Sequence, residues 1–189
     1  YVADSNHGFD VIDISDPTDL QVAGVLDMPG HMHGGVALSG AYAYVADGSF
    51  GLQVIDVSDP ANPAIVGNED TAPWNANGVF VSGSRAYVAG FTWDGQAYSS
   101  GLHVLDISDP EDPEILGSEI TPGQAQSVFV SGSYAYVAVR SSGLQVIDIS
   151  HPYDPVLVGG VDMQGEAIDV VVSGDYVYVA ASGLVVLPV

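Results

Sequence analysis

Hydrophobic and polar positions recur along this chain in one pattern, which predicts short β-strands. In one copy, residues 36–39 and 41–46 are apolar runs separated by a glycine, which predicts a tight hairpin. A polar turn at 47–51 leads to a third apolar run at 52–57, and a Ser-Asp-Pro segment leads to a fourth at 64–67. Four strands therefore fit within one copy of the pattern.

The tripeptide Tyr-Val-Ala occurs five times and marks five copies of this unit. They begin at Tyr1, Tyr44, Tyr87, Tyr136 and Tyr178, so the steps are 43, 43, 49 and 42 residues. Such a period is typical of the four-stranded blades of a β-propeller. The first three strands of each unit carry apolar residues at odd and even positions, so both sheet faces must be covered by neighbouring sheets. The predicted fold class is all-β, a β-propeller with a period of about 42 to 43 residues.

The predicted blades divide a single domain, residues 1–189, into three complete units and two partial ones. The approximate segments are 1–29, 30–72, 73–121, 122–163 and 164–189. The chain begins at the second strand of one unit and ends at the third strand of another. Either the ring is larger and truncated, or five blades close imperfectly. We favour the larger ring, and a first residue other than methionine also points to missing ends.

The third strand of the unit carries the most distinctive motif. Residues 51–60 read Gly-Leu-Gln-Val-Ile-Asp-Val-Ser-Asp-Pro, and 101–110 and 143–152 repeat this pattern closely. The run resembles the LVIVD repeat, and the resemblance covers nearly the whole chain. It implies a β-propeller of bacterial or archaeal proteins that are mostly exported or attached to the cell surface. The family motif contains no catalytic residues. The first copy departs from it at Phe9-Asp10, and the last ends at Leu187-Pro188 without the Ser-Asp-Pro segment.

The strong negative charge of the chain excludes some classes of binding partner. The chain has 24 acidic residues, two arginines, no lysine and a formal net charge of −22. Such a surface repels phosphates and anionic headgroups, so we expect no nucleic acid partner. No apolar run reaches the roughly 18 residues of a membrane span, so we expect no direct membrane insertion. The acidity fits either salt adaptation, which we favour, or calcium binding. With no cysteine, the chain has no disulfide or thiolate site.

Polar positions just before each predicted innermost strand differ between copies while their surroundings repeat. Propeller ligands commonly meet these loops, so the residues are candidates for binding a polar ligand such as a sugar. The alternative is that they line the watery mouth of a channel. The candidates are Trp74, Asn75, Asn77, Gln124, Gln126, Glu166 and Asp169.

His31 and His33 form a His-Met-His pair in the corresponding segment of the second copy. On an extended chain both imidazoles point the same way, which suits a transition metal. Glu166 or Asp169 from another blade would have to complete the site. The alternative is two exposed or water-bonded histidines.

The third copy is lengthened between its second and third strands. Ala89 to Gly101 spans 12 positions, against five in the first, second and fourth copies. The added residues form a predicted loop that includes Phe91, Trp93 and Tyr98. These aromatic side chains suit stacking on a carbohydrate or anchoring a protein partner, although they could equally pack together.

Four aspartates recur at the end of the third strand. Asp13, Asp56, Asp106 and Asp148 recur in four of the five units, which indicates a structural role as hydrogen-bond acceptors near the Ser-Asp-Pro turn. If calcium binds in the turns, Asp16, Asp59 and Asp109 are its expected ligands.

No nucleophile elbow, phosphate-binding loop, zinc-protease helix or dinucleotide fingerprint occurs in the sequence. The leading hypothesis is a non-catalytic propeller scaffold on an exported or cell-surface protein, which binds a protein or glycan partner. The alternative is a metal-binding protein or metal-dependent enzyme that uses His31 and His33. A third hypothesis is an extracellular structural protein that self-assembles through its unfinished terminal blades.

Overall fold

The computed structural model describes residues 1–4, 8–30 and 34–189, and in these ranges the regular structure is entirely β. No helix in the described ranges is long and apolar enough to cross a membrane. The strands form five antiparallel sheets in which chain order equals spatial order. The all-β prediction is confirmed.

The first and last sheets have three strands each, and the three sheets between them have four. The first contains β1 (Val2–Asp4), β2 (Gly8–Asp13) and β3 (Gln21–Leu26). The second contains β4 (Val36–Ser39), β5 (Tyr42–Ala46), β6 (Leu52–Asp56) and β7 (Ala64–Glu69). The third contains β8 (Asn75–Ser82), β9 (Arg85–Trp93), β10 (Tyr98–Asp106) and β11 (Glu114–Ile120). The fourth contains β12 (Ala125–Ser131), β13 (Tyr134–Val139), β14 (Leu144–Asp148) and β15 (Val156–Val161). The fifth contains β16 (Asp169–Ser173), β17 (Tyr176–Ala180) and β18 (Leu184–Pro188).

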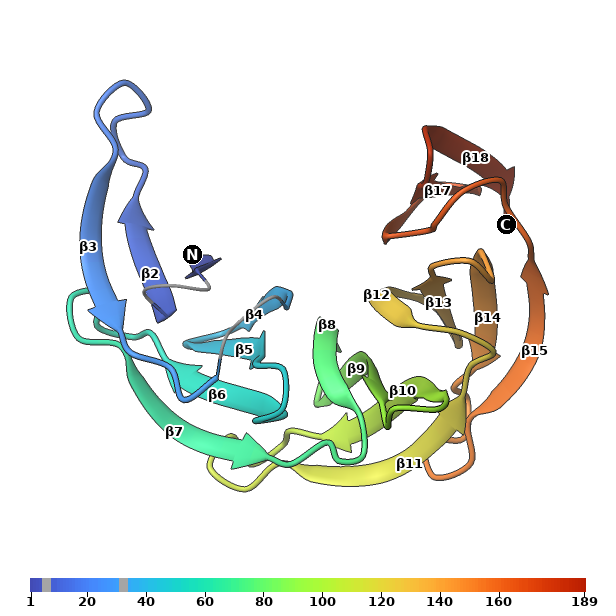
Figure 1. The fold of residues 1–189 in the computed structure, drawn as a ribbon. Coiled ribbons are helices and arrows are strands. Elements are labelled where there is room, and N and C mark those ends of the chain that lie inside the picture. The colour runs from blue at the N-terminus through green and yellow to red at the C-terminus, as the bar shows by residue number, and fades with distance from the viewer. Residues whose placement is uncertain (5–7, 31–33) are drawn as a thin grey trace.

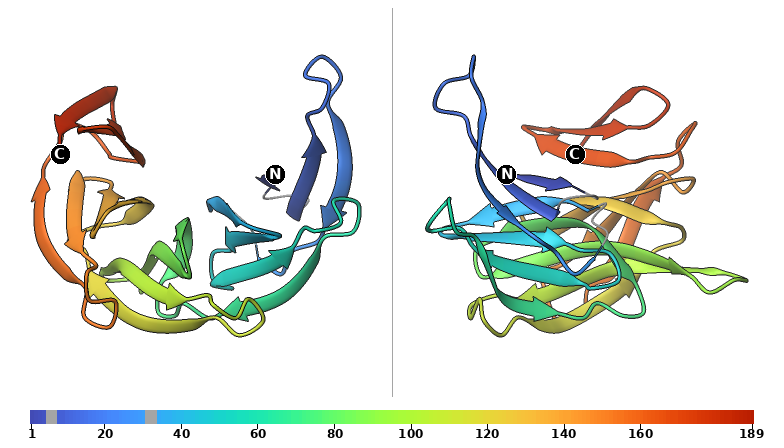
Figure 2. Two further views of the ribbon diagram at one scale, coloured as in Figure 1. Left: turned by 180° about the vertical axis from the view of Figure 1, so that it is seen from behind. Right: turned by 60° about the vertical axis from the view of Figure 1, so that its left-hand side comes forward.

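The sheets stand side by side along an open arc, with the first and last sheets at its two ends (Figure 1). The first strand of each four-stranded sheet lies on the concave side, and the fourth strand runs along the convex edge. The view from behind shows the same arc (Figure 2). The innermost strands of successive sheets are therefore brought together around one axis.

The hydrophobic core consists of layers between neighbouring sheets. Between the second and third sheets, Leu52 and Val54 pack with Val88 and Leu105, and all four side chains are 0% exposed. Equivalent residues form the layers on either side. Because each inner sheet is covered on both faces, its strands are apolar at successive positions instead of alternating. The stacking of sheets thus explains the sequence pattern.

A glycine in the outermost strand lets successive sheets approach closely. A Cβ on Gly67 would overlap the carbonyl oxygen of Pro110, which belongs to the turn of the next sheet. The same relationship joins Gly24 to Pro60, and Gly117 to Pro152. The glycine and the proline turn of the repeat are therefore matched parts of one inter-sheet contact.

The recurring aspartates stabilise the turns, as predicted. The Oδ1 of each aspartate accepts a hydrogen bond of 2.8–2.9 Å from the backbone N–H of the serine two residues later. The pairs are Asp13 with Ser15, Asp56 with Ser58, Asp106 with Ser108, and Asp148 with Ser150. These hydrogen bonds lower the pKa of each aspartate, because they favour the ionised form. The proline-turn aspartates Asp16, Asp59 and Asp109 likewise accept hydrogen bonds from backbone N–H groups two residues later.

Candidate functional site

Two sets of loops share one face of the arc. Because the four strands of a sheet alternate in direction, the loop entering the first strand and the loop joining the second to the third lie at the same end. We call this end the loop face. It carries the candidate residues from the entering loops and the β9–β10 hairpin.

A hollow of about 400 Å³ lies where the innermost strands converge. Its polar side chains are Asn77, Gln126, Ser127 and Asp169, from three successive sheets. The Ser127 hydroxyl donates to Asp169 Oδ1 at 2.6 Å, and Asn77 Nδ2 donates to the Ala125 carbonyl at 3.3 Å. Gln126 Nε2 is buried without a hydrogen-bond partner among the described residues. We call this site the axial hollow.

Small residues allow the axial hollow to form. A Cβ on Gly78 would lie 2.7 Å from the carbonyl oxygen of Gln126, so only glycine permits this approach. The backbone N–H of Gly35 donates to the Asn77 carbonyl at 2.8 Å, which ties the neighbouring strands together. Backbone groups, a few polar side chains and the apolar residues Val79, Val128, Ile168 and Val170 therefore surround the hollow.

The axial hollow unites three of the predicted ligand residues, Asn77, Gln126 and Asp169. Ser127 also lines it, although the sequence analysis did not select it. Its position in the repeat could have identified it, because Ser127 aligns with Asp169, a predicted ligand residue, and with Gly35 and Gly78 in the other copies.

Trp74 lies outside the hollow and packs on β9 and β10 of its own sheet, against Gly90 and Gly101. It is 6% exposed, its ring centroid is 4.4 Å from that of His103, and its Nε1 donates to Ser99 Oγ at 2.7 Å. Its ring is therefore used in packing. Of the other predicted residues, Asn75 is exposed opposite Phe91 in the β8–β9 ladder, and Gln124 is partly buried.

His103 holds this packing in place. Its Nε2 lies 3.1 Å from the Thr71 carbonyl and therefore donates, so Nδ1 accepts from the Ser118 hydroxyl at 2.6 Å. Burial lowers the pKa of His103, because it disfavours the charged imidazolium. The histidine is thus neutral near pH 7 and links the third sheet to the loop before it.

The inserted residues of the third repeat extend two strands, where the sequence predicted a loop. Trp93 at the end of β9 pairs with Tyr98 at the start of β10. In the turn, Asp94 Oδ1 accepts hydrogen bonds from the backbone N–H groups of Gln96 and Ala97, both at 2.8 Å. The hairpin projects beyond its neighbours in the side view (Figure 2). Alternate residues of a strand point to the same side, so the inserted aromatic residues fall together.

Phe91, Trp93 and Tyr98 form what we call the aromatic row. The ring centroids of Trp93 and Tyr98 are 4.5 Å apart, and those of Phe91 and Tyr98 are 6.0 Å apart. Trp93 is 51% exposed and Tyr98 is 53% exposed. The rings therefore pack against one another and still present a surface to solvent.

Arg140 and Glu166 lie at the inner end of the aromatic row. The guanidinium carbon of Arg140 is 5.9 Å from the Phe91 ring centroid, within cation–π range. Arg140 Nη1 also lies 3.4 Å from Glu166 Oε2, an ion pair between partly exposed side chains. Glu166 thus contacts the fourth sheet's loop instead of the axial hollow's polar groups.

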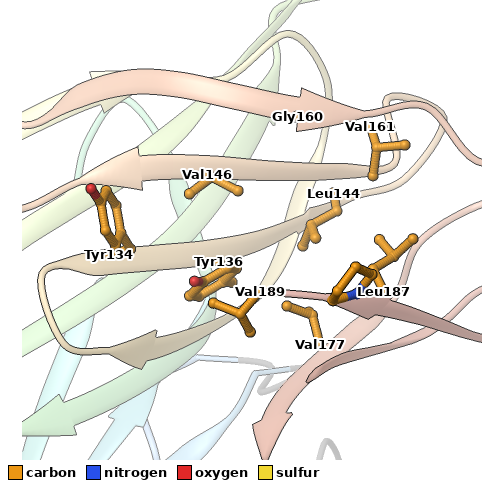
Figure 3. A pocket seen from close by; sticks show the side chains of 10 residues that line it. Tyr134, Tyr136, Leu144, Val146, Gly160, Val161, Val177, Leu187 and Val189 are labelled. Carbon is orange, nitrogen blue, oxygen red and sulfur yellow. The ribbon is translucent and has the colours of Figure 1, made fainter. Parts of the chain in front are cut away.

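An apolar pocket of about 360 Å³ lies between the fourth and fifth sheets (Figure 3). Tyr136, Leu144 and Val146 line it from the fourth sheet, and Val177 and Leu187 line it from the fifth. In the sheet order, β18 is an edge strand, with no fourth strand beside it. The pocket opens at the place where the inner sheets have that strand.

The predicted histidine pair, His31 and His33, lies outside the described residues. Within residues 1–4, 8–30 and 34–189, no group of three or more His, Asp or Glu side chains is placed to hold a metal ion.

Comparison with protein families identifies the repeat. The model for the LVIVD repeat matches residues 1–27, 31–71, 74–121, 122–163 and 164–189. Among curated proteins, none matches the chain.

Solved structures share the architecture. The computationally designed Ika4 protein is 16% identical, with a TM-score of 0.66 over 89% of this chain and 98% of that protein. Glutaminyl cyclase from Myxococcus xanthus is 16% identical, with a TM-score of 0.56 over 79% of this chain. The chain spans 61% of the cyclase. At this identity the likeness shows the fold alone, which is all-β and β-propeller-like.

Proposed function

This chain belongs to the LVIVD-repeat family, and from its loop face we propose that it is a non-catalytic propeller scaffold that binds a protein or glycan partner. We further propose that the scaffold belongs to an exported or cell-surface protein and that the open arc is part of a larger ring. The family motif contributes stacking and turn residues, and the variable residues lie at the loop face.

The exposed aromatic row is the observation that carries this proposal. Trp93 and Tyr98 are about half exposed on a hairpin that only the third repeat extends. Large aromatic side chains supply much of the binding energy of interfaces because they bury a large area with few rotatable bonds. A hairpin with a hydrogen-bonded turn also loses little conformational entropy on binding.

The axial hollow supports the same assignment. It offers a carboxylate at Asp169, a hydroxyl at Ser127 and amides at Asn77 and Gln126. These groups both donate and accept hydrogen bonds, as recognition of a hydroxyl-rich or peptide ligand requires.

The test is a binding screen in which neutral oligosaccharides and a set of peptides are titrated against the wild-type chain and two variants. The double variant W93A/Y98A removes the two exposed rings, whereas Y153A removes a 74% exposed tyrosine in a turn at the opposite end of the sheets. We expect W93A/Y98A to weaken binding by about tenfold or more and Y153A to leave it within about twofold. Equal binding by all three proteins would contradict the proposal.

Self-assembly is a second candidate function. Repeat positions that are buried in the inner sheets are exposed in the sheets at the two ends of the arc. Leu102 and Leu144 are 0% and 3% exposed, whereas Leu184 at the same repeat position is 71% exposed. At the other end, Val2 is 47% exposed and its equivalent Val45 is 0% exposed. Covering a leucine of this kind is worth about 2 kcal/mol, which favours association of these faces.

Sedimentation equilibrium tests the second candidate. We expect the mass of the chain to rise with concentration, and L184S to reduce the association. Ile120 is 69% exposed but ends β11 in the third sheet, which is an inner sheet, so I120S is the control. A monomer mass at every concentration would contradict self-assembly and leave the scaffold proposal intact.

A further inference from the structure

The aromatic row has a carboxylate at each end. At its inner end, Glu166 pairs with Arg140, which lies over Phe91. At its outer end, Asp94 directly follows Trp93 in the chain, and its pKa is lowered by backbone hydrogen bonds from Ala97 and Gln96. Asp94 is therefore ionised at neutral pH. The exposed rings lie between two acidic groups.

The rest of the molecule reinforces this negative potential. The chain carries 24 acidic and two basic residues, for a net charge of −22. One of the two arginines, Arg140, is already paired with Glu166. A field of this sign raises the local concentration of cationic ligands and speeds their association. A partner of opposite charge therefore gains affinity that a neutral partner does not.

The contact between Arg140 and Phe91 shows how such a partner would bind. A guanidinium lies over an aromatic ring and is held by a carboxylate, all within the molecule. Trp93 and Tyr98 offer the same kind of ring beside Asp94, without a guanidinium of this chain over them among the described contacts. The faces of tryptophan and tyrosine are the stronger partners for cations.

We propose that the aromatic row binds a polypeptide segment rich in arginine and lysine, whose cationic side chains stack on Trp93 and Tyr98. This inference rests on the scaffold function proposed above and specifies its partner. A neutral glycan could stack on the same rings, but it would gain nothing from the acidic surface. Each cation–π contact at an exposed ring is expected to strengthen binding by roughly two- to fivefold.

The experiment is a calorimetric titration with three probes at low ionic strength. Nona-arginine carries the proposed chemistry, its citrulline counterpart keeps the shape without the charge, and cellohexaose represents a neutral glycan. The proteins are the wild-type chain, W93A/Y98A, D94N and the control Y153A. Asn keeps the turn-capping oxygen of Asp94, so D94N removes only the charge. Circular dichroism verifies that every variant is folded.

We expect nona-arginine to bind the wild type at least about tenfold more tightly than the citrulline peptide, and binding to weaken as salt is added. W93A/Y98A should weaken the binding of nona-arginine by about tenfold, D94N by about two- to threefold, and Y153A by less than twofold.

Three results would overturn the inference. If Y153A weakened nona-arginine binding as much as W93A/Y98A, the peptide would be attracted to acidic surface in general. If cellohexaose binding depended on Trp93 and Tyr98 while nona-arginine binding did not, the inference would fail and the scaffold proposal would stand. If the binding of no probe depended on these two rings, both would fail.

Discussion

Gly67 and Pro110 lie in contact across the boundary between the second and third sheets, and the carbonyl oxygen of Pro110 occupies the space that a Cβ on Gly67 would need. The contact recurs between Gly24 and Pro60 and between Gly117 and Pro152. It ends at Gly159, where nothing lies within 4 Å of the Cβ position. The fifth sheet lacks the fourth strand and the proline turn that would make the equivalent contact.

A matched pair of alanine variants tests this relationship. G67A should destabilise the chain by about 1–3 kcal/mol, because the outer strand and the next turn must move apart. G159A should change stability by less than about 0.5 kcal/mol, since its Cβ meets open space. Urea denaturation of both variants measures the difference, and equal losses would show that the glycine does not serve the inter-sheet contact.

The leucines of the third strand provide a second comparison of interior and terminal sheets. Leu102 is 0% exposed, and its equivalent Leu184 is 71% exposed. L102A should therefore cost about 2–5 kcal/mol of unfolding free energy, and L184A less than about 1 kcal/mol. The measurement is made at a low protein concentration, so that association does not contribute. A large loss for L184A would mean that the terminal face is already covered.

His103 should make stability depend on pH. Because burial lowers its pKa, the unfolded chain takes up a proton at higher pH than the folded chain does. The contribution of neutral His103 to the free energy of unfolding is therefore complete above the ordinary histidine pKa of about 6.5. Below that pH it falls by up to about 1.4 kcal/mol per pH unit, until folded His103 is also protonated.

H103Q is the matched variant for this prediction. Glutamine occupies the equivalent position in the second and fourth repeats, where Gln53 and Gln145 each donate to a turn carbonyl at 2.7 Å. Thermal unfolding should show the wild type losing more stability than H103Q between pH 7 and pH 5. Parallel losses in the two proteins would show that His103 does not set the dependence.

Removal of metal ions distinguishes the scaffold from the metal-based alternative. We expect EDTA to leave both the circular dichroism spectrum and partner binding unchanged, because stacking on the rings of Trp93 and Tyr98 needs no metal ion. Loss of binding on chelation that Zn²⁺ restores in the wild type but not in H31A/H33A would instead support a site at the histidine pair. Restoration by Ca²⁺ alone would point to oxygen ligands such as Asp16, Asp59 and Asp109.

The repeat made most of the architecture predictable from sequence. The turns at Gly40, Gly83 and Gly132 follow from glycines at positive φ, and the non-alternating apolar strands indicated sheets covered on both faces. The structural role of Asp56 followed from its recurrence in four copies. These features depend on local sequence that is repeated, so each copy supports the others.

Features that depend on contacts between unlike residues were harder to predict. Trp74 was chosen as a ligand residue, but its ring packs on His103, a neighbour 29 residues away at a position that varies between the repeats. The inserted segment was expected to be a loop, but Trp93 and Tyr98 pair and extend two strands. Both outcomes arise from packing that only the folded chain defines.

The most direct test of the scaffold account uses Trp93 as a reporter of binding. Trp74 and Trp93 are the only two tryptophans, so W74F leaves a single, half-exposed indole in the aromatic row. We expect the best ligand from the screens to shift the Trp93 emission to shorter wavelength along the same saturation curve that calorimetry gives. Saturable binding with unchanged Trp93 emission would contradict the scaffold proposal, because the partner would then bind away from the hairpin.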